Sequence, residues 1–449
     1  MPRVYRSKRI YISIILIIGL ALSAVYLPFW RPAYWQARSN LNAMIAQQKA
    51  SGIPVRFSDW ADLDPAGYQI GKQVEDLLNQ LVVPSFEFTQ SLDEHSNLTS
   101  DQIADLRKQI ERNVEVVSKL KSIERIEECR FQHDFRTPSP PSLLLPMYDK
   151  FRALVAHCRG NALLALHDRD DKLLVASIVE LASMSELLRK EPFLVSFQIR
   201  LRSINQAIDL LELLLASASI TPEQFVLLDD RLQSLESNLL SEPAIRGEAT
   251  LQFTTLENIG HPEVRKALEA TVALSSSGEA ISVSPGKTKL ARWGAWSYLP
   301  ELMAQQILSI GLMNRYAELV DQTGASANLD WAESQQSLRV LMNAMADSPI
   351  AVLFPAIDHS RNAVLATRTR LRAARIAIRV IRFYRENGKL PEALEEVCDE
   401  KLSQLPLGLL QHDTPELIRR SDHLVVGYQP DVDHKEMKTR VNVQLLNAP

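Results

Sequence analysis

The feature that most limits how this chain can fold is an apolar run near its N-terminus. It extends almost without interruption from Ile10 to Trp30, and four basic residues precede it: Arg3, Arg6, Lys8 and Arg9. At a rise of about 1.5 Å per residue, a helix of about 21 residues crosses a hydrocarbon core of about 30 Å. We therefore expect residues 10–30 to form a single transmembrane helix.

The residues on either side of this run predict its orientation. The basic tail, residues 1–9, is expected to stay in the cytoplasm, and the aromatic side chains of Tyr26, Trp30, Tyr34 and Trp35 to lie at the opposite interface. A cleavable signal peptide is the alternative, because small residues precede Ala24 where a peptidase would cut. The apolar run continues past that point, which favours a retained anchor and an extracytoplasmic, periplasmic location for the rest of the chain.

Beyond this segment, the composition favours helices and argues against one class of partner. Only 15 of the 449 residues are Gly, and Leu, Ala, Arg, Glu and Gln dominate long stretches. The 50 Lys and Arg residues are balanced by 54 Asp and Glu residues, a net charge of −4. No excess of positive charge is available for a nucleic-acid backbone. We predict an all-α, antiparallel helical array that does not bind nucleic acid.

Apolar residues recur at three- and four-residue spacing, and helix-start signals precede two of these stripes. Thr99 and Gln102 are spaced as a capping box, while Thr221, Pro222 and Gln224 combine an N-cap, a proline at the first helical position and a box partner. We expect the stripes to form the core. They are Ile103, Leu106, Ile110, Val114, Val117, Leu120 and Ile123; Phe193, Phe197, Leu201, Ile204, Ile208, Leu211 and Leu215; and Phe225, Leu228, Leu232, Leu235 and Leu239.

A polar stretch suggests how these helices are grouped. Residues 275–291 are predicted to link a helical array over residues 31–274 to a second helical part over residues 292–404. Near the C-terminus, two β-like runs, Leu424–Tyr428 and Thr439–Leu445, are spaced to pair. We expect a small β-hairpin within an appendage that spans residues 405–449.

One helix before this appendage carries a row of arginines. At about 100° per residue, five of them fall within an arc of about 80°, and apolar residues occupy nearly all the rest of the helix. They are Arg368, Arg372, Arg375, Arg379 and Arg382, the arginine ridge. An exposed arginine face of this kind is usually solvated or paired with neighbouring acids. The alternative is that it binds an external anion, because guanidinium groups hold carboxylates and phosphates bidentately. Contact with lipid or peptidoglycan is a variant of the second interpretation.

The end of this helix has the pattern of a joint between helices. Gly388 can adopt the left-handed conformation that terminates a helix, and Pro391 can begin the next. Leu390, Leu394 and Val397 are then expected to pack back onto the core.

The remaining polar motifs predict no catalytic, cofactor or metal site. His167, Asp168, Asp170 and Asp171 lack the spacing of a calcium loop, so helix capping is preferred over metal binding. Asp93, Glu94 and His95 fall in a polar loop. Asp431, Asp433 and His434 fall in the predicted hairpin loop, where only an adventitious metal is conceivable. Ser284–Thr288, SPGKT, lacks the glycine that a phosphate-binding loop requires at Ile281.

The cysteines leave two arrangements open. Cys158 lies in the centre of an apolar stripe, which favours burial as a small hydrophobic residue. A disulfide between Cys129 and Cys158 is the alternative. With three Cys residues in total and no CxxC pair, a structural zinc site is not expected.

Two segments carry a family resemblance. Residues 367–397, TRTRLRAARIAIRVIRFYRENGKLPEALEEV, and residues 162–235, which include the Glu191-Pro192 step, are similar to uncharacterised planctomycete-type membrane-anchored helical proteins. The first segment also distantly resembles type II secretion pseudopilins, although the N-terminus lacks a pilin processing segment. Where the family pattern continues into an Asp-Pro turn, this chain has Leu405–Leu409, LPLGL. The resemblance implies a membrane-anchored helical protein and no known activity.

Together these observations predict a binding or scaffold protein of the bacterial envelope, with another envelope protein as its partner. The alternative is an envelope hydrolase whose pair of acidic residues comes from distant helices. No small-molecule ligand is indicated. A hydrolase should have a pocket lined by ionisable groups with perturbed pKa values.

Overall fold

The computed structural model describes residues 35–36, 38–61, 65–82, 99–133, 135, 145–216, 220–258, 261–262, 357–398, 416–419, 423–427 and 440–444. The predicted transmembrane segment, residues 10–30, and the predicted linker, residues 275–291, lie outside these ranges. Two of the polar motifs also lie outside, namely Asp93–His95 and Asp431–His434, as does Ser284–Thr288. Within the described ranges, no helix combines the length and apolar character needed to cross a bilayer.

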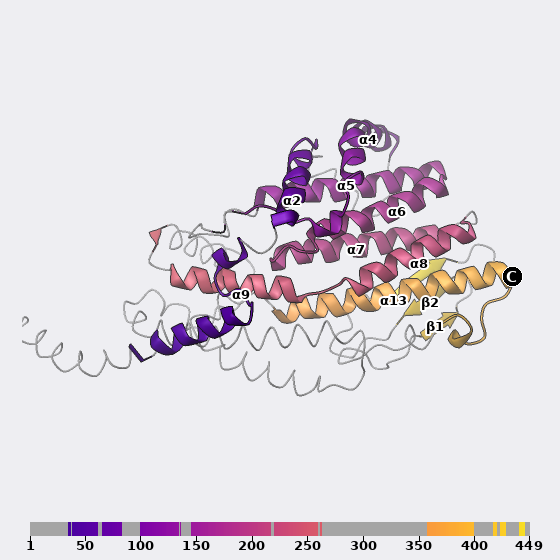
Figure 1. Cartoon of the computed structure of the whole chain (residues 1–449). Coiled ribbons are helices and arrows are strands. Elements are labelled where there is room, and N and C mark those ends of the chain that lie inside the picture. Colours follow the sequence, from indigo (N-terminus) through magenta and orange to yellow (C-terminus); the bar gives the residue numbers. More distant parts are fainter. Residues whose placement is uncertain are drawn as a thin grey trace, which may run out of the picture.

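Long helices form the body of the protein. Helices α5 (Leu145–Asp168), α6 (Asp171–Ser185), α7 (Leu194–Leu215), α8 (Pro222–Ser237) and α13 (Ile357–Asn387) lie side by side (Figure 1). On one side, α2 (Pro65–Leu78) and α4 (Ser100–Lys121) pack against α5, while α9 (Glu242–Glu257) contacts α7. The predicted helical array is therefore confirmed for the described part of the chain.

The helix directions differ in one respect from a wholly antiparallel array. Ion pairs join Arg372 to Glu236 and Arg379 to Asp229, so α13 runs antiparallel to α8. On α7, however, Asn205 donates a hydrogen bond to Thr367, and Glu212, further along α7, accepts one from Arg370, further along α13. The contacts advance in the same direction on both helices, so α13 runs parallel to α7. Because α7 and α13 are not consecutive along the chain, no short loop imposes on them the reversal that it imposes on two successive helices.

The predicted helix starts are confirmed, whereas one predicted core position is wrong. Thr99 and Thr221 both form capping boxes with the glutamine three residues later. Val114, in contrast, is 54% exposed, and its neighbour Asn113 is buried instead. The Asn113 side chain accepts a hydrogen bond from the N–H of Val82 and donates one to the carbonyl of Val82, at 2.9 and 3.2 Å. This pair of bonds explains why a polar residue replaces valine on the inner face.

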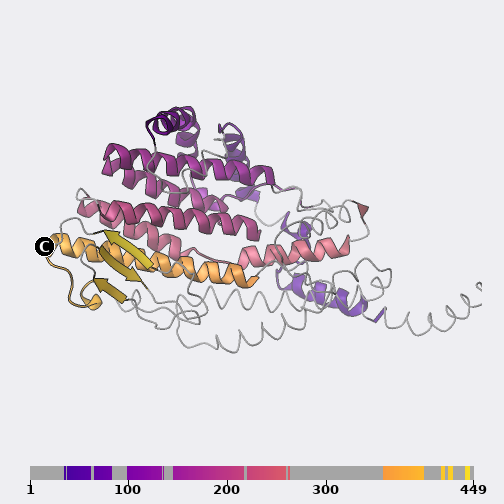
Figure 2. The same ribbon diagram turned by 180° about the vertical axis from the view of Figure 1, so that it is seen from behind.

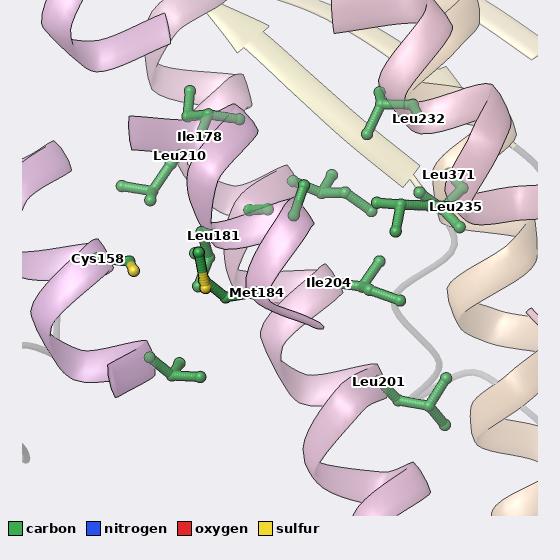
Figure 3. Close-up of a cluster of buried hydrophobic side chains, with 14 of the residues drawn as sticks. Cys158, Ile178, Leu181, Met184, Leu201, Ile204, Leu210, Leu232, Leu235 and Leu371 are labelled. Carbon is green, nitrogen blue, oxygen red and sulfur yellow. The ribbon is translucent and has the colours of Figure 1, made fainter. Parts of the chain in front are cut away.

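One large hydrophobic core extends through the described helices, and a smaller cluster surrounds Leu106 and Leu164. The seven stripe residues from Phe193 to Leu215 are all buried, as are the five from Phe225 to Leu239. Figure 3 shows Leu201 and Ile204 of α7, Leu232 and Leu235 of α8 and Leu371 of α13 within one cluster. Residues from both sides of the predicted linker thus contribute to the same core.

Three antiparallel strands cover another face of the bundle. The predicted hairpin is confirmed, since β2 (His423–Gly427) pairs with β3 (Arg440–Gln444). A third strand, β1 (Glu416–Arg419), pairs with the other edge of β2 and was not expected from the sequence. Leu424, Val426 and Val441 are buried. The sheet contacts α7 and α13 (Figure 2), so it is a layer of the fold rather than a free appendage.

The segment before α2 is attached to α9 by a group of hydrogen bonds. Residues 38–50 are helical, and a short 3₁₀ helix, η1 (Phe57–Trp60), follows. Arg56 donates two hydrogen bonds to the carboxylate of Glu257, at 2.8 and 2.7 Å. The Phe57 N–H and the Trp60 indole donate to Thr254 and Thr250, respectively. These contacts connect the residues that follow the predicted anchor to the helical body.

Candidate functional site

The arginine ridge of α13 faces α8. Arg368, Arg372 and Arg375 are buried, and Arg379 and Arg382 are partly exposed. Arg368 donates to the carbonyl oxygen of Leu239 at 2.9 Å. The other buried members and Arg379 meet a row of polar side chains on one face of α8, at the i, i+4 and i+7 positions that a helix aligns. This row consists of Asp229, Gln233 and Glu236.

The two rows form a continuous set of ion pairs. Arg375 donates to Asp229 at 2.7 Å and to Glu236 at 3.0 Å, and Arg379 donates to the second oxygen of Asp229 at 3.0 Å. Burial lowers the pKa of Arg375, but its hydrogen bond to Asp229 and the charges of Asp229 and Glu236 outweigh burial and raise the pKa above its ordinary value. The pairing interpretation of the ridge therefore holds for its inner part.

This pairing changes what the ridge can do chemically. An external anion would have to displace carboxylates that already satisfy Arg372, Arg375 and Arg379 within the chain. Arg382 is the most exposed member, at 44% of its side chain, and it pairs with Glu386 on its own helix at 2.7 Å. The anion-binding hypothesis thus applies best to the outer end of the ridge.

Arg370 forms a second cluster of ion pairs, on a different face of α13 from the ridge. This cluster was not predicted from the sequence. Arg370 is 1% exposed and donates to Asp209 and Glu212 of α7, as well as to the backbone carbonyl of Asn205 at 3.1 Å. The signal in the sequence is the i, i+3 spacing of the two acids on α7, which are otherwise surrounded by apolar residues. Together with the ridge, Arg370 joins α13 to both of its neighbouring helices.

A groove lies at the outer end of the ridge, between α8 and α13. We call it the α8–α13 groove; its volume is about 360 Å³. Five of its lining side chains are apolar and five are charged. The lining residues are Phe225, Val226, Asp229, Asp230, Ile378, Arg379, Arg382, Phe383, Glu386 and Val397.

Two of the three acidic side chains in the groove form ion pairs with arginines. Asp229 holds Arg375 and Arg379, and Glu386 holds Arg382. Asp230 is exposed and forms no ion pair within the described part of the chain. The groove therefore presents one uncompensated negative charge beside an apolar surface to which Val226, 44% exposed, belongs.

The predicted joint after α13 is partly confirmed, and it closes one side of the groove. Gly388 has a φ of 70°, and its N–H bonds to the carbonyl of Tyr384 at 2.8 Å. Pro391 does not begin an α-helix, because Ala393 is extended and only a 3₁₀ turn, η8 (Leu394–Glu396), follows. Leu390, Leu394 and Val397 pack against the core, as predicted.

The other motifs have structural roles. Asp170 caps α6 by accepting from the N–H of Leu173 at 2.9 Å, which confirms the capping interpretation, and Asp168 binds Arg107. All three cysteines are free, so no Cys129–Cys158 disulfide forms. Cys158 is buried in the core, as expected. Among the described residues, no group of His, Cys, Asp and Glu is arranged to hold a metal.

Glu191, which precedes Pro192, belongs to a buried polar cluster that sequence reasoning did not identify. Its carboxylate accepts from the Phe131 N–H at 2.8 Å and lies 2.7 Å from the Nε2 of His133. The His133 ring packs edge-on against Phe135 and Phe193. The side chains of His133 and Glu191 are 5% and 0% exposed, so this acid and base have no access to a substrate and instead fix the loop before α5.

Comparisons of this chain with protein families, curated proteins and solved structures find no match. The resemblance to planctomycete-type helical proteins therefore stays a sequence-based expectation.

Proposed function

We propose that this chain is a binding or scaffold protein of the bacterial envelope, held in the membrane by residues 10–30. The N-terminal tail lies in the cytoplasm, and the helical body lies outside it and binds another envelope protein. The observation that carries the proposal is the α8–α13 groove, in which apolar side chains are combined with charges of both signs. An apolar centre with a polar rim is the usual anatomy of a protein-binding surface.

The attachment of the N-terminal segment supports a scaffold in particular. Arg56, Phe57 and Trp60 bind α9, so the segment that follows the anchor is joined to the same body that carries the groove. A partner bound at the groove would then be held at a defined place relative to the membrane. The inward pairing of Arg372 and Arg375 supports a rigid body, because both arginines link α13 to α8.

Affinity purification tests the proposal. The tagged full-length protein is purified from gently solubilised membranes and compared, by quantitative mass spectrometry, with an anchor-only control that contains residues 1–30. A stoichiometric partner that requires residues 31–449 is the expected result. Recovery of the protein alone and monomeric at native abundance would contradict the proposal and favour a search for substrates.

A further inference from the structure

We propose that the α8–α13 groove binds an amphipathic helix of the partner, which places apolar side chains in the groove and a lysine or arginine against Asp230. This inference rests on the proposed function and adds the chemistry of the partner to it. The observations that carry it are the course of the groove along two helices and its uncompensated charge.

The shape of the groove suits a helix. Nine of its ten lining residues lie on adjacent turns of two antiparallel helices: positions 225, 226, 229 and 230 of α8, and positions 378, 379, 382, 383 and 386 of α13. The tenth, Val397, lies in the segment that follows α13 and closes one side. The channel between two such helices runs along their axes, and a third helix can insert its side-chain ridge there. A volume of about 360 Å³ is at the lower end of the range for small-molecule pockets, which fits a few side chains better than a large ligand.

The surface chemistry defines the face of the partner helix. Phe225 and Ile378 are buried beneath the groove, whereas Val226 is 44% exposed and Phe383 and Val397 are partly exposed. An apolar stripe on the partner would cover these exposed side chains and remove them from water. A polar partner helix would leave them in contact with polar groups and gain little.

The charges of the groove indicate which charge the partner helix should carry. Arg379 and Arg382 already have carboxylate partners in Asp229 and Glu386. Asp230 adds a negative charge with no internal counterpart among the described residues. A basic residue at the edge of the apolar stripe would complete the charge pattern, whereas an acidic residue there would face a like charge.

Photo-crosslinking in native membranes tests this proposal. A photoreactive benzoylphenylalanine replaces Val226 in the groove or, as a control, Val114, which is 54% exposed on α4. We expect a crosslink from position 226 to a helical segment of another envelope protein with apolar residues at three- and four-residue spacing and a flanking Lys or Arg. Asp230→Lys should lower the yield by at least about tenfold. Asp76→Lys, at an exposed position of α2, should leave it unchanged. Reversal of the partner's basic residue to Glu should restore crosslinking to Asp230→Lys.

The other outcomes separate the two proposals. A crosslink from position 226 to a second copy of this chain, or to a segment of the same chain, overturns the partner-helix inference. Crosslinks to a partner from position 114 alone place its binding site elsewhere: the groove inference is then lost while the scaffold function stands. If neither position crosslinks to another protein and none co-purifies, both proposals fail.

Discussion

Acidification is expected to destabilise the bundle through one buried histidine, His157 of α5. The residue is 8% exposed, and its Nδ1 has no hydrogen-bond partner in the described part of the chain. Burial, and to a smaller extent the charge of Lys121, lowers the pKa of His157 from 6.5 to about 4. The imidazole therefore stays neutral in the folded protein at pH values where it is protonated in the unfolded chain.

The size of the effect follows from the two pKa values. Because the folded pKa is the lower one, unfolding takes up a proton, and stability falls as the pH falls from 6.5 to about 4. The difference of about 2.5, at about 1.4 kcal/mol per pKa unit, corresponds to a loss of about 3 kcal/mol. Nearly all of this stability is present above pH 7, and no further loss from His157 occurs well below pH 4. For a domain with a typical stability of about 5–15 kcal/mol, such a loss is substantial.

Urea unfolding of the detergent-solubilised protein and of the His157→Gln variant, followed by circular dichroism, measures this loss. The difference in unfolding free energy between the two proteins cancels the contributions of their shared titrating groups. It should change by about 3 kcal/mol in favour of His157→Gln between about pH 7 and pH 4. A difference that stays constant across this range would refute the argument that His157 is buried in its neutral form.

Three further substitutions test packing, pairing and capping, each by urea unfolding at neutral pH. Gly247→Ala should cost several kcal/mol, because the added Cβ would lie 1.4 Å from the carbonyl oxygen of Pro192; a cost below about 1 kcal/mol would show that α9 does not cross so closely. Arg370→Met should cost about 3–5 kcal/mol, since it removes a buried guanidinium that bonds to the partly buried Asp209 and Glu212, whereas Arg382→Met, at the exposed end of the ridge, should cost less than about 1 kcal/mol. Equal costs would contradict the difference in burial. Thr221→Ala should cost about 1 kcal/mol through loss of the capping box of α8, and no change would argue against that cap.

Local patterns explain why much of the fold could be predicted. Capping boxes at Thr99 and Thr221, the left-handed Gly388 and the Asp170 cap depend on neighbours within a few residues, so short stretches of sequence contain them completely. The hairpin of β2 and β3 could also be predicted, because each strand is a short run that contains two valines. Val114 shows the limit, because a hydrogen-bonding partner from another segment placed Asn113 inside instead.

The candidate site could be predicted only in part. The arginine ridge could be recognised in the sequence, but not whether it is solvated, pairs with acids or binds an anion. The acids that pair with it could not be found, because Asp229 and Glu236 lie more than 130 residues away from Arg375 along the chain. The exposed Asp230 and the groove beside it also depend on this long-range packing.

The helical character of the body, the positions of its best-capped helix starts and the apolar faces that form its core follow from periodicity and local hydrogen bonding, and so are written in the amino-acid sequence. The packed chain adds that α13 runs parallel to α7 and antiparallel to α8, that the ridge is mostly paired within the chain, and that its outer end opens into a groove. These features appear only on packing because ion pairs and grooves are properties of two surfaces in contact. A single helix specifies one of those surfaces, and the neighbour that completes it is chosen by packing of the whole chain.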